Sequence, residues 1–387
     1  MTWPTIQSRL TRFLAAMLFL AATLACAADY KDVVYVGTYT DKGSKGIYSF
    51  RFDPASGELG PVELAAETPN PSFLAVDRNP PFLYAVNELG VFGGSMTGAV
   101  SVFAVDRDTY KLKLVQQVSS AGAGPAHISL DNTGQFVLVA NYDGGNIAVF
   151  PIGKDGRLGT RTAFVQYAGS SVNKDRQSAP HPHEIVSSSD NRFVLVPDLG
   201  TDRLMVYRFN AATGGLTPAH PAFVKVPPGS GPRHLAIAPS GKFVYLVNEL
   251  SSAVTVLAFD SSSGQLHQQQ TVPTLPREFT GKNTTAEIEV DAGGKFLYVS
   301  NRGDDSIAVF AIDPHDGKLT LVERTPTRGK TPRQFTLDPT GKWMFAANQD
   351  SNTINLFAVD ATSGRLTATS HSVQVPAPVC VVILSLK

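Results

Sequence analysis

The chain has 387 residues with 33 basic and 33 acidic side chains, so its formal charge at neutral pH is zero. Nucleic-acid-binding proteins normally carry a basic excess, and this balance argues against that class. Charged residues make up 17% and hydrophobic residues 43% of the chain, a composition typical of a folded globular protein rather than a disordered one.

The first segment, residues 1–27, has the pattern of an export signal. Two arginines precede an apolar run over 13–24, and Ala25-Cys26-Ala27 follows as a small-x-small cleavage pattern. The run is shorter than the about 20 apolar residues that a membrane-spanning helix needs. We therefore expect cleavage near Ala27, a periplasmic or secreted mature chain, and no stable membrane insertion. A lipid anchor on Cys26 is the alternative.

A turn-like segment that ends in leucine recurs seven times after residue 30. The final leucines of the copies lie 46 to 58 residues apart, about the length of one propeller blade. Between the copies, short β-rich runs alternate apolar and polar residues and are bounded by Asp, Gly, Ser and Asn, as strands and hairpins are. The copies are DPASGEL at 53–59, DRDTYKL at 106–112, GKDGRL at 153–158, NAATGGL at 210–216, DSSSGQL at 260–266, DPHDGKL at 313–319 and DATSGRL at 360–366.

Each repeat predicts four short strands, and neighbouring repeats must stack because one such sheet cannot bury both of its faces alone. The chain ends complement each other: 33–40 has the pattern of a second strand without a first, and 378–384 that of a first strand without a second. Joined, they complete one blade and close a ring, which removes exposed sheet edges. We therefore predict an all-β, seven-bladed propeller over residues 28–387, present as a monomer.

The start of each inner strand breaks the repeat and is a candidate for function. Inner strands of a propeller line the central channel, so polar residues at their leading ends gather around one mouth. Four histidines, His127, His181, His183 and His234, lie in or beside this column. The paired positions are Ser72-Phe73, Ala126-His127, His183-Glu184, Arg233-His234, Ala286-Glu287, Arg333-Gln334 and Val379-Cys380.

The end of each second strand forms another column, in which six of the seven residues are Asn or Asp. Such residues usually satisfy backbone groups at turns, and a structural role is expected for Thr38, Asn87, Asn141, Asp198, Asn248, Asn301 and Asn348. The next residue varies, and variation within a repeated scaffold marks a position that is free to carry function. These residues are Tyr39, Glu88, Tyr142, Leu199, Glu249, Arg302 and Gln349.

The longest repeat contains an insertion at about 166–184, directly before an inner strand. A polar loop beside the channel mouth could close over a ligand. A solvated extension of the hairpin is the alternative.

Several segments resemble the bacterial propeller lactonases of the 6-phosphogluconolactonase type, which are in turn similar to the fungal carboxymuconate-lactonizing propellers. These segments are GSSVNKDRQSAPHPHE at 169–184, LVPDLGTDRL at 195–204, GSGPRHLAIAPSGKFVYLVNEL at 229–250 and LYVSNRGDDSIAVF at 297–310. The match covers essentially the whole mature chain. The chain departs from the family at Tyr167, where relatives often have His, and in its export signal, since the phosphorylated sugar lactone is a cytosolic intermediate.

The resemblance implies that His183, Arg233, Glu249 and Arg302 form the catalytic site. From the two columns we expect substrate to be bound by His127, His181, Asp198, His234, Glu287 and Arg333. Lactone hydrolysis needs a base that activates water and cationic or N–H groups that stabilise the oxyanion. We assign Glu249 as the base and His183 as the acid or alternative base. A buried Glu249–Arg302 ion pair that braces neighbouring blades is the structural alternative.

The implied substrate is a small sugar-acid lactone, either 6-phosphogluconolactone or an unphosphorylated aldonolactone such as gluconolactone. An arginine pair suits a phosphate or carboxylate, because guanidinium donates two aligned hydrogen bonds to such groups. We expect no cofactor and no metal, since the sequence has no H-E-x-x-H motif or cysteine pair in the mature chain. The alternatives are a non-catalytic ligand- or protein-binding propeller of the cell envelope and a carboxymuconate-type lactonizing cycloisomerase.

Overall fold

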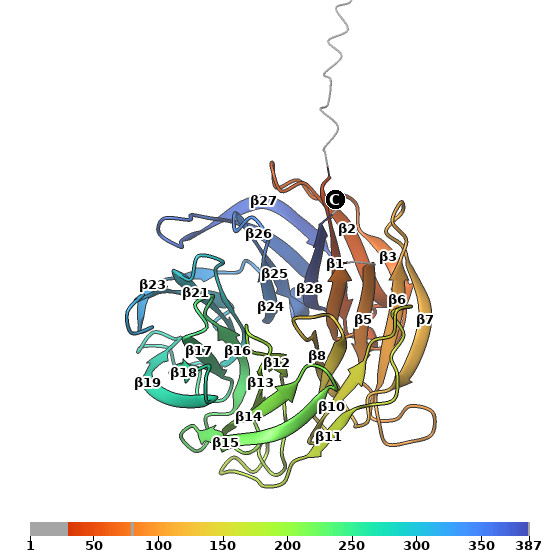
Figure 1. Ribbon diagram of the computed structural model, residues 1–387. Coiled ribbons are helices and arrows are strands. Elements are labelled where there is room, and N and C mark those ends of the chain that lie inside the picture. The colour runs from red at the N-terminus through yellow and green to blue at the C-terminus, as the bar shows by residue number, and fades with distance from the viewer. Residues whose placement is uncertain (1–29, 79–80, 386–387) are drawn as a thin grey trace, which may run out of the picture.

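In the computed structural model, which describes residues 30–78 and 81–385, the chain folds into seven four-stranded sheets around a central axis (Figure 1). Besides strands, these residues form two short 3-10 helices, η1 (Thr40–Lys42) and η2 (Gln349–Ser351). The predicted all-β, seven-bladed propeller is confirmed. The expected export signal lies outside the described residues, and within them no helix has the length and apolar character to cross a bilayer.

Each blade runs from an inner strand near the axis to an outer strand at the rim, and consecutive strands pair antiparallel. Blade 1 contains β28 (Pro378–Ser385), β1 (Asp32–Thr38), β2 (Gly46–Phe52) and β3 (Glu63–Glu67). Blade 2 contains β4 (Phe73–Arg78), β5 (Pro81–Asn87), β6 (Ala99–Val105) and β7 (Leu112–Ser119). Blade 3 contains β8 (Pro125–Leu130), β9 (Phe136–Asn141), β10 (Asn146–Pro151) and β11 (Ala163–Gln166).

The remaining four blades follow in chain order around the ring. Blade 4 contains β12 (Val186–Ser187), β13 (Phe193–Asp198), β14 (Arg203–Asn210) and β15 (Gly215–Lys225). Blade 5 contains β16 (Pro232–Ile237), β17 (Phe243–Asn248), β18 (Ala253–Asp260) and β19 (Gln265–Pro273). Blade 6 contains β20 (Thr284–Val290), β21 (Phe296–Arg302), β22 (Ser306–Ile312) and β23 (Leu319–Pro326), and blade 7 contains β24 (Pro332–Leu337), β25 (Trp343–Asn348), β26 (Thr353–Val359) and β27 (Leu366–Gln374).

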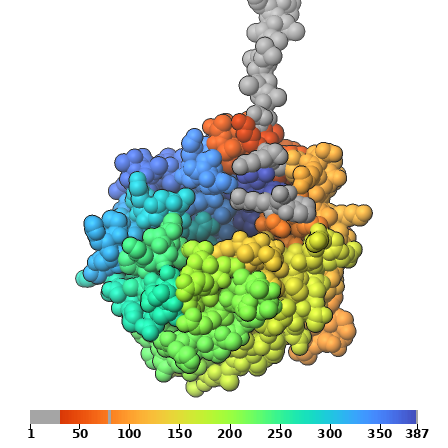
Figure 2. Space-filling model, viewed as in Figure 1, coloured from red at the N-terminus to blue at the C-terminus, as the bar shows by residue number. Residues whose placement is uncertain are grey.

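The ring closes in blade 1, whose strands come from both ends of the chain. β28 pairs with β1 from Asp32↔Ser385 to Thr38↔Pro378, and the two strands lie side by side in Figure 1. In the space-filling view of the same face, the colours follow the chain around the disc (Figure 2). β28 also contacts the inner strands of blades 2 and 7, so the predicted split blade is confirmed and joins both of its neighbours.

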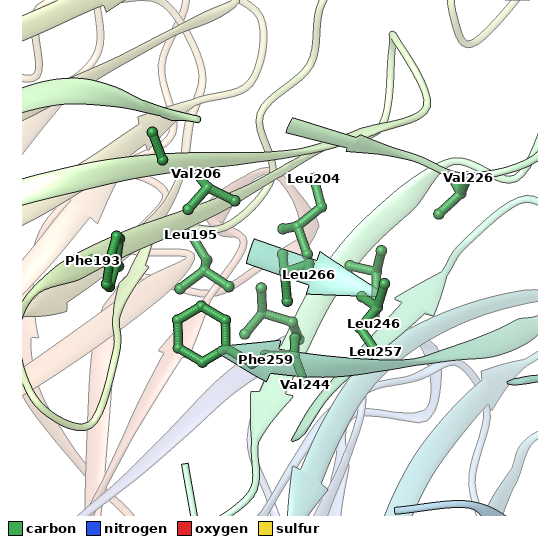
Figure 3. Packing of buried hydrophobic residues seen from close by; sticks show 12 residues of the cluster. Phe193, Leu195, Leu204, Val206, Val226, Val244, Leu246, Leu257, Phe259 and Leu266 are labelled. Atoms are coloured by element: carbon green, nitrogen blue, oxygen red, sulfur yellow. The ribbon is translucent and has the colours of Figure 1, made fainter. Parts of the chain in front are cut away.

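Apolar clusters fill the spaces between adjacent blades, and the described residues form one cluster for each of the seven interfaces. Between blades 4 and 5, the ring of Phe193 lies edge-on to that of Phe259, with centroids 5.9 Å apart, and both belong to the cluster shown in Figure 3. Between blades 7 and 1, the ring of Phe345 lies edge-on to that of Phe52, with centroids 4.9 Å apart. The core is therefore a ring of sheet-to-sheet contacts rather than one central cluster.

The recurrent glycine turn joins the third and fourth strands of a blade and touches the preceding blade. Gly264 has a φ of 83°, and a Cβ there would lie 2.3 Å from the ring of Phe193. Gly57 makes the same close contact with Trp343. Only glycine combines this left-handed backbone with so close an approach. The glycine recurs in the sequence because the turn packs closely against the preceding blade.

The Asn and Asp residues that end the second strands are buried and hold turns, as predicted. Asn87 Nδ2 donates to the carbonyl of Pro69 at 2.6 Å. The carboxylate of Asp198 accepts from the backbone amides of His181 and Gly200 at 2.7 and 3.1 Å. The oxygens of Asp198 thus hold the end of the insertion and the loop after β13, and the residue is not among those that line the cavity described below; that it binds substrate stays a prediction.

Polar side chains inside the channel join the inner strands of neighbouring blades. Each accepts a hydrogen bond from a backbone amide of the next inner strand, which has no sheet partner on its channel side. These bonds join the Ile185 amide to His127 Nδ1 (3.4 Å), the Leu235 amide to Glu184 Oε2 (2.6 Å), the Leu337 amide to Glu289 Oε2 (3.0 Å) and the Val381 amide to Gln334 Oε1 (3.0 Å).

The channel carboxylates predict an unusual dependence of stability on pH. Burial raises the pKa of Glu289 to about 8. In the unfolded chain Glu289 releases its proton above the ordinary pKa of 4.5, whereas in the folded chain it keeps the proton up to about pH 8. The free energy of unfolding therefore falls as the pH rises from 4.5 to about 8. Glu289→Gln imitates the protonated acid and should leave the unfolding free energy unchanged at pH 4 and increase it at pH 9. Urea unfolding at both pH values tests this, and a lower stability at pH 9 would contradict it.

Candidate active site

β-Bulges at the start of the inner strands of blades 5 and 7 take the first residue of the predicted pair out of the regular strand alternation. The register between β16 and β17 shifts between Pro232 and His234, so Arg233 is the extra residue. The same shift between Pro332 and Gln334 makes Arg333 the extra residue of β24. A bulge re-aims a side chain out of the normal alternation of a strand, which explains why the inner-strand column breaks the repeat.

The insertion gives His183 a similar position by a different route. Blade 4 has an inner strand of only two residues, β12, preceded by an isolated bridge between Pro182 and Asp198. The register shifts by one residue between this bridge and the Val186↔Leu195 pair. The backbone amide of His183 still donates to the carbonyl of Pro197 at 3.1 Å, so irregular chain takes the place of the first half of the strand.

A polar cavity of about 380 Å³ opens at this mouth. Both predicted columns and the insertion contribute to its wall, which confirms that they meet in one place. The lining residues are Glu88, Ala126, Tyr142, Arg176, His183, Glu249, Thr284, Arg302 and Arg333.

Glu249 lies at the centre of a buried cluster of guanidinium groups. Its Oε1 accepts from Arg176 Nη2 at 2.7 Å, and its Oε2 lies 3.0 Å from Arg233 Nε and 3.1 Å from Arg302 Nη2. The three arginines hold the pKa of this carboxyl at about 2 against the opposing effect of burial. Glu249 is therefore a fixed carboxylate with both oxygens engaged, and the Glu249–Arg302 ion pair weighed from the sequence is present within a larger cluster.

Backbone carbonyls of blade 6 hold the two inner arginines in place. Arg233 Nη1 donates to the carbonyl of Ala286 at 2.7 Å, and Arg302 Nη2 donates to that of Thr285 at 2.9 Å. Burial and the neighbouring Arg302 and Arg333 lower the pKa of Arg233 to about 9, so it still carries its charge at neutral pH. The Nε atoms of Arg233 and Arg302 have no hydrogen-bond acceptor, although that of Arg233 is in ion-pair contact with Glu249.

A second cluster forms the opposite wall of the mouth. Arg333 Nη2 donates to the hydroxyl of Tyr39 at 2.7 Å, and this hydroxyl donates to Glu88 Oε2 at 2.9 Å. The Arg333 guanidinium also lies 5.1 Å from the centre of the Tyr39 ring. Blades 7, 1 and 2 thus fix the orientation of Arg333.

Among the four residues predicted to be catalytic, His183 is the one without a charge. Burial, the guanidinium of Arg233 and the neighbouring His234 lower its pKa well below the ordinary 6.5, so the ring is neutral at pH 7. Its Nδ1 is buried without a hydrogen-bond partner. The ring lies edge-on to those of Tyr142 and His234, with centroids 5.3 and 5.1 Å away. A neutral imidazole that lines a polar cavity has a lone pair that can accept a proton.

The insertion packs over one side of the mouth and carries Arg176 to Glu249. Gln177 Nε2 donates to the carbonyl of Leu199 at 2.8 Å, and Ser171 Oγ donates to Asp202 Oδ2 at 2.5 Å. The loop is therefore tied to blade 4 and contributes Arg176 to the cavity wall, and its closing over a ligand stays a prediction. Tyr167, by contrast, packs in the core between blades 3 and 4.

Several predicted substrate-binding residues lie behind the cavity rather than on its wall. His181 stacks on Tyr142 with ring centres 4.3 Å apart, and its Nδ1 lies 2.9 Å from the carbonyl oxygen of that residue. His127 is buried deeper in the channel, with its Nε2 3.8 Å from Glu184 Oε1. His234 and Glu287 line a small cavity beneath the main one. Of the six, only Arg333 lines the main cavity.

Sequence reasoning did not assign roles to Glu88, Tyr142 and Arg176. The first two occupy the variable column after the second strand, so the signal was present but unspecific. Arg176 lies in the insertion, and its pairing with Glu249 across 73 positions of sequence has no local signature.

The site as a whole carries excess positive charge. The wall of the main cavity carries three guanidiniums (Arg176, Arg302 and Arg333) and two carboxylates (Glu88 and Glu249), and Arg233 lines the small cavity rather than this wall. Such a site favours a ligand or transition state that is negatively charged. Within the described residues, no group of three or more His, Cys, Asp or Glu side chains is arranged to hold a metal ion.

Comparison with known proteins places the chain in a family. A family model described as a lactonase, 7-bladed beta-propeller, matches residues 33–383. The 6-phosphogluconolactonase of Bacillus subtilis is 36% identical over 303 residues, which cover 78% of this chain and 84% of that protein. A periplasmic gluconolactonase from Pseudomonas aeruginosa, known by its structure, is 37% identical with a TM-score of 0.86, and the match covers 92% of this chain and 99% of that one. The chain therefore belongs to the lactonase family of seven-bladed β-propellers.

Proposed function

We propose that the protein is an exported lactonase that hydrolyses the lactone of a sugar acid to the open acid. The observation that carries this proposal is the combination, in one polar cavity, of a neutral buried imidazole with an excess of fixed guanidinium groups. Ester hydrolysis needs a base for water and positive charge for the oxyanion that forms on the carbonyl. The relatives named for gluconolactone and its 6-phosphate support the same substrate class.

His183 is the base in this proposal, in place of the Glu249 assigned from the sequence. A carboxylate with a pKa of about 2 and three guanidinium partners has little tendency to take a proton. His183 keeps its lone pair at neutral pH and accepts the proton of the attacking water. Glu249 instead acts as a positioning residue, because it fixes Arg176, Arg233 and Arg302 around one point.

The arginines stabilise the negative charge that the reaction creates. Attack of water on the lactone carbonyl gives a tetrahedral oxyanion, and collapse of this species expels the ring oxygen, which takes a proton and becomes a hydroxyl group. The product is a carboxylate at neutral pH. Both the intermediate and the product are more negative than the lactone, and an arginine cluster binds them better than it binds a neutral substrate.

Export favours an unphosphorylated aldonolactone as the substrate, since sugar phosphates are intermediates of the cytosol. The surplus guanidinium charge favours an anion. Initial rates on gluconolactone and on its 6-phosphate, measured by pH-stat against a no-enzyme control, separate these two influences. We expect clear turnover of gluconolactone. A KM at least about tenfold lower for the phosphate would assign a guanidinium to the phosphoryl group and contradict the preference for the neutral lactone.

The same assay separates the enzyme from a non-catalytic binding protein and from a metal-dependent one. Turnover that is unchanged by EDTA is expected. The absence of turnover on any sugar lactone would favour a binding propeller.

Export is tested by N-terminal sequencing of the mature protein. The sequence of the mature chain should begin near Ala28 or Asp29, and a mature chain that keeps residues 13–24 would contradict export.

A further inference from the structure

A small cavity lies directly beneath the main one, inside the channel. Its volume is about 10 Å³, which is about what one water molecule needs. His183, His234 and Glu287 contribute to its wall. His183 lines both cavities, as do Glu88, Ala126 and Arg333, so its ring forms part of the partition between the substrate side and the channel side.

The wall of this cavity carries polar atoms that no protein group satisfies. His183 Nδ1, His234 Nε2, Glu287 Oε2 and the hydroxyl of Ser72 are all buried without a hydrogen-bond partner. Leaving a buried polar atom unpaired costs about 1–3 kcal/mol. Several such atoms around a space of this size provide the two to four polar contacts that an internal water requires.

The groups behind the cavity form a continuous series. The rings of His183 and His234 are 5.1 Å apart between centroids, and His234 Nδ1 lies 3.1 Å from Glu287 Oε1. Glu287 Oε1 also accepts from the backbone amide of Ile288 at 3.0 Å, which fixes the carboxyl. The side chains of His183, His234 and Glu287 are each more than nine-tenths buried.

We propose that a water in this cavity, His234 and Glu287 form a buried proton relay behind His183. This inference rests on the proposed lactonase function. When His183 Nε2 takes a proton from the attacking water, its Nδ1 proton passes to the cavity water, which gives a proton to His234 Nε2. His234 then gives its Nδ1 proton to the Glu287 carboxylate. After these transfers, His183, the cavity water and His234 each hold as many protons as before, and Glu287 has become a carboxylic acid. The proton later returns along the same path to the ring oxygen.

The charges around the relay agree with this direction of transfer. Burial raises the pKa of Glu287 to about 7, while the pKa of His183 is lowered well below 6.5, so a proton released by the imidazolium moves to the carboxylate at neutral pH. The carboxylate is available in a substantial part of the molecules near pH 7. Glu287 is surrounded by charged or titratable groups from several elements. These are Arg233 and His234 of β16, His183 and Glu184 before β12, Glu88 after β5, Glu289 of β20 itself, Arg333 of β24 and Cys380 of β28.

The variant Glu287→Gln removes the final acceptor and keeps the shape of the side chain. We expect kcat to fall about 10- to 100-fold, the range found when the carboxylate partner of a metal-bound histidine is removed, with KM within about twofold of the wild type. Because the relay needs the carboxylate form, the wild-type kcat should rise with pH through about 7, and this rise should be absent in the variant. The matched control is Glu289→Gln, which removes the next carboxylate on the same strand and leaves the relay intact.

A second variant keeps the test sharp. His234→Gln interrupts the middle of the relay, so the double variant with Glu287→Gln should lose no more kcat than the stronger single variant. Multiplied losses, or a wild-type pH profile in Glu287→Gln, would overturn the relay.

A readout that is independent of activity separates the relay from the proposed function. A high-resolution crystal structure of the full mature chain should show one water within hydrogen-bond distance of His183 Nδ1 and His234 Nε2. A dry cavity would overturn the relay even if the protein is a lactonase. If the water is present but the wild type hydrolyses no lactone, the proposed function fails and the relay is tested by ¹⁵N-histidine titration instead. In that titration, the protonation of His183 should be coupled to that of Glu287 in the wild type. The coupling should be lost in Glu287→Gln, and its persistence there would overturn the relay.

Discussion

Replacing His183 by glutamine is expected to lower kcat about 10²- to 10⁴-fold, the range that a general base contributes. Glutamine keeps a polar side chain of similar reach on the partition between the two cavities but cannot take a proton at neutral pH. Glu249 and the arginines are untouched, so the KM for lactone should change little. Initial rates measured by pH-stat and melting curves of the same preparations give both quantities.

Chemical rescue separates the base from a merely structural residue. In His183→Ala, added imidazole should restore part of the lost rate, because the truncation leaves space beside the cavity that a free base can occupy. His267→Gln, on the exposed face of the outer strand β19, controls for the loss of a histidine as such. A His183→Gln variant that keeps more than about a tenth of the wild-type kcat would contradict the role of His183 as the base.

Ending the chain after Ala377 is expected to prevent stable folding. This truncation removes β28, the inner strand of blade 1, with the buried side chains of Val379, Val381 and Leu384. Burial of three such side chains contributes about 5–9 kcal/mol. That loss is comparable to the whole stability of a typical domain, about 5–15 kcal/mol, and it also exposes one edge of β1 and opens the ring.

A chain that ends after Ser385 retains β28 and serves as the control. It should melt cooperatively at the wild-type temperature, whereas the chain that ends at Ala377 should be insoluble or lack near-ultraviolet circular dichroism. If the shorter chain melts cooperatively within about 5 °C of the control, β28 does not contribute the stability that this prediction assigns to closure of the ring.

Much of the fold follows from the sequence because its determinants are local and repeated. The glycine of each turn, such as Gly264, needs a left-handed backbone, and the strand patterns between turns have a period of two. Seven copies of one local pattern leave little freedom in the number of blades. The split blade was also predictable, because each chain end lacks the strand that the other supplies, as at Val36↔Val381.

The positions of the candidate site residues follow from the same repeat, but their roles do not. Glu249 and Arg302 occupy equivalent positions in adjacent blades, so their approach at the mouth was predictable. The assignment of Glu249 as base depended on its surroundings: Arg176 arrives from an insertion that has no counterpart in the other blades. One added guanidinium changes the role that a carboxylate can perform, because it stabilises the charged form.

The sequence by itself determined the all-β class, the seven blades, the closure by the two chain ends and the two columns that meet at one mouth. Only the tertiary structure decided which residues share the cavity, which lie behind it and which carry charge. Arg233 and Arg333 occupy equivalent positions in their inner strands, yet Arg333 lines the main cavity, whereas Arg233 lines the small cavity beneath it and is in ion-pair contact with Glu249. The reason is physical: strand patterns depend on neighbours in sequence, whereas pKa values and hydrogen bonds inside the channel depend on contacts between blades that lie about 50 residues or more apart.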